Sequence, residues 1–258
     1  MAGLVVIGFD SEWVEIGDTG RNHILSYQFA GITAAGKWTG IIYTDGPDQQ
    51  YRLTLKDLMR KAIIAGRSAG VLPSRWPTDI YATAHFSRAD LAGFRDYSQL
   101  KYQFDAIRKT YVTLNARLPY TCRIYDDNRH AHDLRIFLRD TVTLAAGGTK
   151  LSDLGEAHGL PKLNLPDGMI GQMDVLLRDD PDLYERYAIR DAEIAALHLW
   201  DMTKFSIENG FDATPPLTLG SLAVQHLENI WRDEGINSRD VLGQEVVILL
   251  EGIQSPGY

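Results

Sequence analysis

Residues 4–10, Leu-Val-Val-Ile-Gly-Phe-Asp, form an unbroken apolar run that ends in a carboxylate, and this run limits what the chain can fold into. A continuous apolar run of this length is typical of a strand that is covered on both faces. Two more strand-like runs follow at residues 24–32 and 38–44, and Ala35-Gly36-Lys37 between them indicates a turn. Because so little chain separates the runs, the sequence predicts three neighbouring antiparallel strands.

Helical and strand patterns alternate along the rest of the chain. Apolar residues at helical spacing predict an amphipathic helix over 54–66. The other predicted elements are a strand at 79–85, a short helix at 88–97, irregular strands that include 109–114 and 134–144, helices at 150–158 and 172–178, a long helix that begins near Pro181 and ends at Asn209 and Gly210, and an amphipathic helix over 219–230. We therefore expect an α/β domain over residues 1–210 and a C-terminal helical extension over 211–258. The apolar segment 246–250 is interpreted either as a terminal strand or as surface that packs against more protein.

The composition excludes two classes of protein. The chain has 258 residues, of which 45% are hydrophobic and 23% charged, as in soluble globular proteins. A single cysteine excludes a disulfide scaffold, and no apolar run is long enough to cross a membrane. The N-terminus has neither the basic flank nor the cleavage site of a signal peptide, so the expected location is the cytoplasm.

The net charge of -8 argues against a protein that coats long nucleic acids by bulk electrostatics. Residues 108–140 differ, because they carry seven basic and four acidic side chains among interleaved aromatic residues. Cations for phosphates and flat rings for bases are what a strand-binding surface needs. A solvated face of ordinary strands has the same pattern and is the simpler interpretation.

Asp10 and Glu12 place two carboxylates at the end of the first predicted strand. Side chains alternate along a strand, so both project to the same face. Carboxylate oxygens are the ligands that Mg²⁺ and Mn²⁺ prefer, and such ions would relieve the repulsion between the two acids. The alternative is a strand end that has reached the surface and shows its charges to water.

Two further acids lie in suggestive positions. Tyr187 and Asp191 are four residues apart on the long predicted helix, which stacks the phenol and the carboxylate on one face. Asp90 follows directly after the predicted strand at 79–85, at the start of a short helix. A core-edge tyrosine beside a solvated aspartate explains the first pattern without any function, and a helix N-cap explains the second.

In this order, the acids resemble the three exonuclease motifs of the DEDD superfamily of 3′-5′ exonucleases, which have a ribonuclease H-like fold. Tyr187, four residues before Asp191, resembles the DEDDy branch, which includes the proofreading domains of family B DNA polymerases. The other branch has histidine five residues before the aspartate, where this chain has Arg186. The segment Lys162-Leu-Asn-Leu is similar to the lysine motif of family B exonuclease domains.

The resemblance implies an α/β fold with a ribonuclease H-like mixed sheet flanked by helices, followed by the helical extension. It implies that Asp10, Glu12, Asp90 and Asp191 bind two ions, Mg²⁺ or Mn²⁺, that Tyr187 orients the attacking water, and that Lys162 offsets charge on the scissile phosphate. The residues that would contact nucleic acid are Ser11, His85, Phe86 and Lys162. Phe86 departs from the family, which usually has asparagine there.

The implied activity is metal-dependent removal of nucleotides from the 3′ end of single-stranded DNA, with RNA left open as a substrate. The implied partner is a DNA polymerase domain or a replication assembly, and the sequence leaves open whether the chain is free-standing or part of a polymerase. The alternative is a catalytically silent module that binds nucleic acid and guides a strand. Because all four acids are present, the sequence favours the enzyme.

Three other motifs are weaker. Gly66-Arg-Ser-Ala-Gly70 matches a nucleophile elbow, but a helix precedes it and no helix is predicted directly after it, so glycines closing a helix are the better interpretation. Gly147-Gly-Thr-Lys150 lacks the spacing of a phosphate-binding loop. His130 and His132 have no second pair nearby and do not predict a zinc site.

Overall fold

The computed structural model describes residues 3–17, 20–107, 109–114, 119–211, 214–237 and 241. Its first three strands form the predicted antiparallel meander. These strands are β1 (Val6–Glu15), β2 (Asn22–Thr33) and β3 (Gly36–Tyr43). The first strand continues five residues beyond the apolar run, because pairing with β2 carries it past Asp10 to Glu15. Asp10 and Glu12 therefore lie within a paired strand.

The second half of the sheet is parallel. β4 (Asp79–Ala84) pairs parallel to β1, and β8 (Ala131–Asp140) pairs parallel to β4. β7 (Tyr120–Tyr125) closes the edge antiparallel to β8, which gives the order β3-β2-β1-β4-β8-β7. The two short strands β5 (Asp105–Ile107) and β6 (Thr110–Val112) pair separately. This mixed sheet confirms the predicted α/β class and is compatible with a ribonuclease H-like fold.

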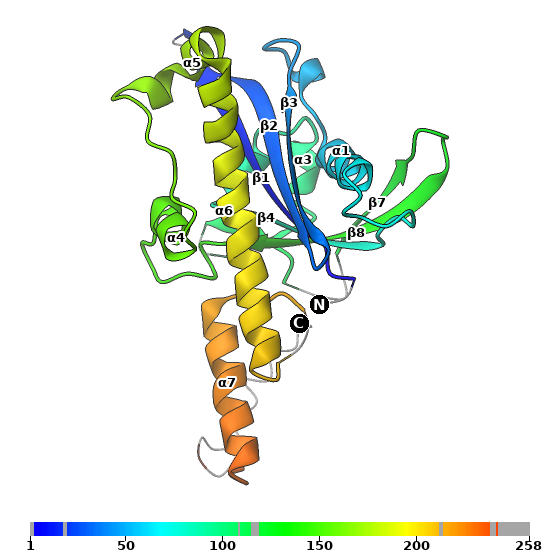
Figure 1. The fold of residues 1–258 in the computed structure, drawn as a ribbon, viewed down its shortest axis with the longest axis vertical. Helices are drawn as coiled ribbons and strands as arrows, with labels where there is room; N and C mark the ends of the chain where they lie inside the picture. Colours follow the sequence, from blue (N-terminus) through cyan, green and yellow to red (C-terminus); the bar gives the residue numbers. More distant parts are fainter. Residues whose placement is uncertain are drawn as a thin grey trace.

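Helices cover both faces of the sheet (Figure 1). Side chains of β1 alternate, so Ile7 and Phe9 pack with helix α1 (Leu55–Ser68), whereas Val6 packs with the long helix α6 (Pro181–Glu208). The other helices are α2 (Ser87–Leu91), α3 (Tyr97–Leu100), α4 (Leu151–Ala157), α5 (Met173–Asp179) and α7 (Leu219–Asp233), with 3₁₀ turns at Gln49–Tyr51 and Met169–Gln172. By this alternation Asp10 and Glu12 lie on the α6 face.

Glycine lets α6 lie directly on the sheet. A Cβ at Gly8 would stand 2.2 Å from the Ala192 carbonyl oxygen and 2.8 Å from the Ala196 nitrogen. Small residues on the helix complete this close approach, because Ala192 and Ala196 are both fully buried. The contact fixes the distance between β1 and the helix segment that carries Asp191.

Several predicted elements differ in their bounds. The helix predicted over 88–97 is two short helices, since residues 92–96 form turns between α2 and α3. The irregular strands predicted at 109–114 and 134–144 correspond to Thr110–Val112 and Ala131–Asp140, and β7 in the same stretch was not separately predicted. Gly70, with φ of +71°, follows the end of α1, which confirms that its glycines close a helix.

The helical extension is attached to the sheet at its beginning. Thr143 accepts a backbone hydrogen bond from Leu219, and its hydroxyl donates to the Leu217 carbonyl. The buried Arg139 guanidinium donates to the Pro215 carbonyl at 3.1 Å. The boundary at residues 210 and 211 stays a prediction, and the segment 246–250 lies outside the described residues. No helix in the described part of the chain could cross a membrane.

Candidate active site

Four acids come together on the face of the sheet that helix α6 covers. Asp10 and Glu12 come from β1, Asp90 from α2 and Asp191 from α6. Burial raises the pKa of the Asp10 carboxyl well above its usual value, and the charges on Asp90, Glu12 and Asp191 raise it further. Residues separated by up to 181 positions in the chain thus lie within electrostatic reach of one another.

Asp90 is anchored by the strand that carries the first two acids. The Ser11 backbone N–H and hydroxyl donate to Asp90 Oδ1 at 3.1 and 3.0 Å. Both donors of this buried serine are therefore used to position Asp90, and its contact with nucleic acid stays a prediction. The N-cap of α2 is Phe86, so the interpretation of Asp90 as a helix cap is wrong.

A buried carboxylate that sequence reasoning did not place in the site shapes the loop before α2. Asp140, at the end of β8, accepts hydrogen bonds from the Phe86 and Ser87 backbone N–H groups at 3.1 and 2.5 Å. The Thr110 hydroxyl and the Val142 N–H donate to the same side chain. Phe86 is fixed in a left-handed conformation with φ of +67°, which costs energy for a bulky residue.

The fixed loop exposes the Phe86 ring four positions before Asp90. Its exposed fraction is 39%, which is high for a phenylalanine. The neighbouring His85 is half-buried, and its Nδ1 lies 2.8 Å from the Thr141 hydroxyl. Burial lowers the pKa of His85, so its ring is neutral near pH 7. This pair gives the site one flat apolar surface and one neutral polar ring.

On α6, Asp191 and Tyr187 both contact Lys162. Lys162 Nζ donates to Asp191 Oδ2 at 2.5 Å and lies 5.0 Å from the centre of the Tyr187 ring. Burial would lower the pKa of Lys162, but the Asp191 carboxylate outweighs it and the pKa is raised. Asp191 is only 8% exposed, so the interpretation of a solvated aspartate beside a core tyrosine is wrong.

Burial and mutual repulsion dominate the electrostatics of the four acids. Burial raises the pKa of Glu12 to about 8, with Asp191 as the largest charge that adds to the shift. Burial raises the pKa of Asp90 to about 7, although hydrogen bonds from Ser11 and Asp10 lower it in part. Asp191 also has a raised pKa, again from burial, despite its bond to Lys162.

These residues fit divalent cations. Asp191 Oδ1 is buried and has no hydrogen-bond partner, and its three neighbours supply further oxygen ligands of the kind that Mg²⁺ and Mn²⁺ prefer. In the described part of the chain no three His, Cys, Asp or Glu side chains already have the arrangement of a finished metal site. The acids are gathered, but Lys162 and Ser11 each occupy one carboxylate oxygen.

The raised pKa values predict an unusual pH dependence of stability. Between pH 4.5 and about 8, the folded protein in chelator keeps protons on Glu12 and Asp90 that the unfolded chain has already released. These protons stabilise the folded state fully at pH values below the pKa values of the unfolded chain. This stabilisation is lost as the pH rises through the pKa values of the folded protein. We expect Tm in EDTA to fall by about 5 °C between pH 5 and 8.

Differential scanning calorimetry in EDTA measures this fall, and Mn²⁺ at pH 8 should restore Tm by replacing the protons. The Glu12→Gln variant, which cannot ionise, should flatten the profile. A wild-type Tm that rises steadily over this range would contradict the electrostatic account of the site.

Three of the five basic side chains in the described part of 108–140 are paired or buried, whereas Lys109 and Arg129 are exposed. Arg123 pairs with Asp133 at 2.7 Å and Arg135 with Asp79 at 2.6 Å. Arg139, Tyr111 and Phe137 are buried, whereas Arg108 and Arg117 lie outside the described residues. The interpretation of ordinary strand residues is therefore the better one here.

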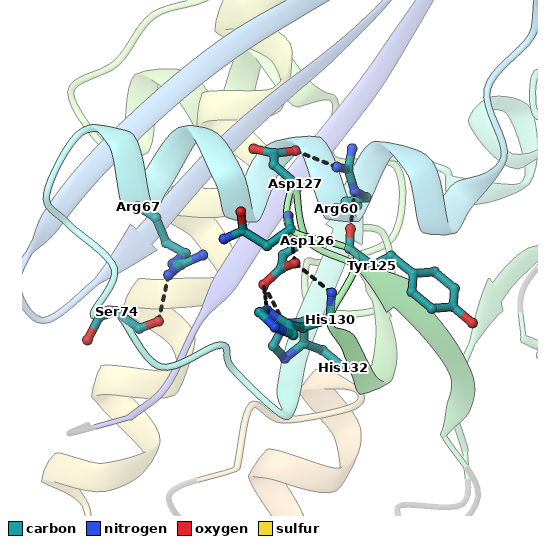
Figure 2. A network of polar contacts seen from close by, with 9 residues as sticks. Arg60, Arg67, Ser74, Tyr125, Asp126, Asp127, His130 and His132 are labelled. Carbon is teal, nitrogen blue, oxygen red and sulfur yellow. Dashed lines mark hydrogen bonds and ion pairs between the residues drawn. The ribbon is translucent and has the colours of Figure 1, made fainter.

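The two histidines of that stretch have a structural partner. His130 Nδ1 and His132 Nε2 lie 3.2 and 3.3 Å from Asp126 Oδ2, in the turn between β7 and β8 (Figure 2). Arg60 of α1 fastens the same turn through the Tyr125 carbonyl and Asp127. These contacts account for both histidines without a metal.

Comparison with known proteins gives one informative match. No model of a known protein family matches the sequence. Over 256 residues the chain is 30% identical to the primer-independent DNA polymerase PolB of Escherichia coli. This chain is similar to part of a DNA polymerase. The match covers 93% of the chain but 29% of the polymerase, so the chain spans less than a third of its relative's length.

Proposed function

We propose that this chain is a metal-dependent 3′-5′ exonuclease of the DEDDy type that hydrolyses single-stranded DNA. The single observation that carries the proposal is the convergence of Asp10, Glu12, Asp90 and Asp191 from three separate elements. The similarity to a DNA polymerase supports DNA as the substrate and proofreading during replication as the role. A polymerase domain is the partner that this role requires.

The four acids would bind two divalent ions, Mg²⁺ or Mn²⁺. When bound, such ions activate the attacking water and stabilise the charge that develops on the departing 3′ oxygen. The protein contributes the fixed positions of the ligands: Ser11 orients Asp90, and the contact of Gly8 with α6 sets the distance between Asp10 and Asp191. The ions would also neutralise the acids, so that an anionic phosphodiester can approach.

Tyr187 and Lys162 would act beside the ions. Burial raises the pKa of Tyr187, so the phenol stays protonated near pH 7 and orients the water by a hydrogen bond rather than as a base. Lys162 remains charged because Asp191 raises its pKa, and it can offset charge on the scissile phosphate. The exposed ring of Phe86 offers a stacking surface for a base, with His85 as a neutral polar neighbour.

The proposed activity is tested with 5′-labelled single-stranded DNA and RNA of the same sequence. Each is incubated with the chain and Mg²⁺, Mn²⁺ or EDTA, and the products are resolved at single-nucleotide resolution. We expect a ladder that shortens from the 3′ end with DNA and either ion, and no products in EDTA. A phosphorothioate-blocked 3′ end should stop the ladder.

Two results would overturn the proposal. Internal cuts that ignore the 3′ block would indicate an endonuclease. Tight binding of the strand without cleavage under any metal condition would favour the silent strand-guiding module instead.

The Tyr187→Phe variant removes the hydroxyl and keeps the ring, so it tests the role of the hydroxyl. The ring would keep its packing and its place 5.0 Å from the Lys162 ammonium, whereas the hydrogen bonds of the hydroxyl, to Lys162 and to the proposed water, would be lost. We expect kcat to fall by about 10- to 100-fold with KM for the strand unchanged. Steady-state kinetics on the labelled DNA measure both constants, and a kcat equal to that of the wild type would remove Tyr187 from the mechanism.

A further inference from the structure

A buried polar network lies beside the four acids and takes no part in the mechanism described so far. The Tyr184 hydroxyl lies 2.5 Å from the Ser26 hydroxyl, and Gln28 Nε2 lies 2.5 Å from the same oxygen. All three side chains have an exposed fraction of zero. Polar groups buried this deeply destabilise a protein unless they are fully hydrogen-bonded.

The strand register places this network next to the acids. Asp10 pairs with Gln28 and Glu12 with Ser26 across the antiparallel strands β1 and β2. Directly opposed residues share a face of the sheet, and their Cβ atoms are about 4.5–5.5 Å apart. Burial raises the pKa of Tyr184, and the charges of Glu12 and Asp10 raise it further, as expected for a network that lies close to both acids.

One atom of the network has no partner. Gln28 Oε1 is buried and accepts no hydrogen bond when Nε2 donates to Ser26. Exchanging Oε1 and Nε2 of this amide leaves the shape of the side chain unchanged and changes which group donates and which accepts each hydrogen bond. Ser26 then donates to Gln28 Oε1, Tyr184 donates to Ser26, and the Gln28 NH₂ group becomes the free end. A donor, unlike an acceptor, is attracted to a cluster of carboxylates.

We propose that Gln28 is a positioning residue whose side-chain amide donates a hydrogen bond to the Asp10 carboxyl. The donors then run in one direction, from Tyr184 through Ser26 and Gln28 to Asp10. The amide thus orients one oxygen of Asp10 and stabilises its charge. This inference deepens the proposed function and rests on it where Asp10 is taken as an ion ligand.

The test compares Gln28→Met with Gln28→Glu. Methionine keeps the length of the side chain and removes the donor, whereas glutamate keeps the shape and replaces the donor by a carboxyl. Two measurements are made: the pKa of Asp10 in metal-free protein by carbonyl NMR, and Mn²⁺ affinity by electron paramagnetic resonance of the free ion. The control is Thr203→Val, which alters a buried polar side chain just as the Gln28 variants do. Thr203 lies on α6, more than three turns beyond Tyr187.

We expect Gln28→Met to raise the pKa of Asp10 further and to weaken Mn²⁺ binding by about tenfold, as for the loss of one charge-assisted hydrogen bond. Gln28→Glu should raise the pKa more than Gln28→Met, because it adds a carboxyl opposite Asp10. Thr203→Val should change neither quantity. If either Gln28 variant fails to fold, Tyr184→Phe, which removes the first donor, should weaken Mn²⁺ binding by about threefold.

Two results would overturn the inference. If Gln28→Met matches the wild type in both measurements, the amide does not contact Asp10. If Gln28→Glu binds Mn²⁺ at least as tightly as the wild type, the amide presents its oxygen, not its nitrogen, to the site. A wild-type chain that cleaves no DNA would overturn the proposed function alone, since the metal-free pKa of Asp10 reports the contact without any reaction.

Discussion

Asp10→Asn is expected to reduce hydrolysis of 3′ ends by at least about a thousandfold and, in chelator, to make the protein more stable. Burial opposes the ionisation of Asp10, and so does each of the charges on Asp90, Glu12 and Asp191. A neutral amide removes that repulsion, so the folded state gains stability near pH 8. It also removes a charged ligand between the other acids, so ion binding and hydrolysis are lost together.

Asp191→Ala should reduce hydrolysis as strongly but with the opposite effect on stability. Lys162 Nζ donates to Asp191 Oδ2, and removing that carboxylate leaves a half-buried ammonium group without its partner. The pair of variants therefore separates the catalytic effect, which both share, from the effect on stability, which differs in sign.

Activity is measured by release of nucleotides from the labelled strand and stability by thermal unfolding in EDTA. Asp133→Asn is the matched control, because this acid pairs with Arg123 on the surface and should leave the rate unchanged. Wild-type hydrolysis by Asp10→Asn, with a normal circular dichroism spectrum, would show that the acid cluster is not the active site.

The sequence is sufficient to predict the acids that the structure brings together. Asp10 and Glu12 share a face because side chains alternate along a strand, and Tyr187 and Asp191 share a face because they are four residues apart on a helix. These are local periodicities, which hold wherever the element is placed in the fold. That the two pairs face each other followed only from the resemblance, since no local pattern reports which face of β1 the helix α6 covers.

The residues that support the site could not be predicted, because their partners are distant in the sequence. Asp140 acts through backbone groups more than 50 positions away, and Tyr184 reaches Ser26 across 158 positions. The left-handed Phe86 runs against local preference, which favours glycine or asparagine at such a position. The hydrogen bonds of Asp140 maintain this conformation. The sequence feature that could have predicted it is an acid at the end of the strand β8.

The interleaved arginines of residues 108–140 support the simpler of the two interpretations of their pattern, which is a face of ordinary strands. Their spacing resembles that of a surface that binds a nucleic-acid strand. However, Arg123 pairs with Asp133 on β8, and Arg135 pairs with Asp79 on β4. Cross-strand pairing depends on register, and the register of β7 against β8 is set by the turn at Asp126 rather than by the charges. A charge pattern alone therefore overestimates the free basic surface.

Gly8→Ala is expected to lower the free energy of unfolding by roughly 3 kcal/mol and the rate by about a hundredfold, although the residue contacts no substrate. The added Cβ would stand 2.2 Å from the Ala192 carbonyl oxygen and 2.9 Å from the Ala196 Cβ. Both belong to α6, whose backbone atoms cannot move independently, so the helix as a whole has to shift. Asp191, next to Ala192, would move away from Asp10.

The matched control is Gly147→Ala, where a Cβ meets no atom within 4 Å. It should unfold and cleave DNA as the wild type does, which excludes a general effect of replacing glycine by alanine. Chemical denaturation measures the loss of stability, and the rate is compared at a temperature where Gly8→Ala is fully folded. If Gly8→Ala then cleaves at the wild-type rate, the spacing between β1 and α6 does not set the geometry of the acids, since a helix displaced by one methyl group would have left the site intact.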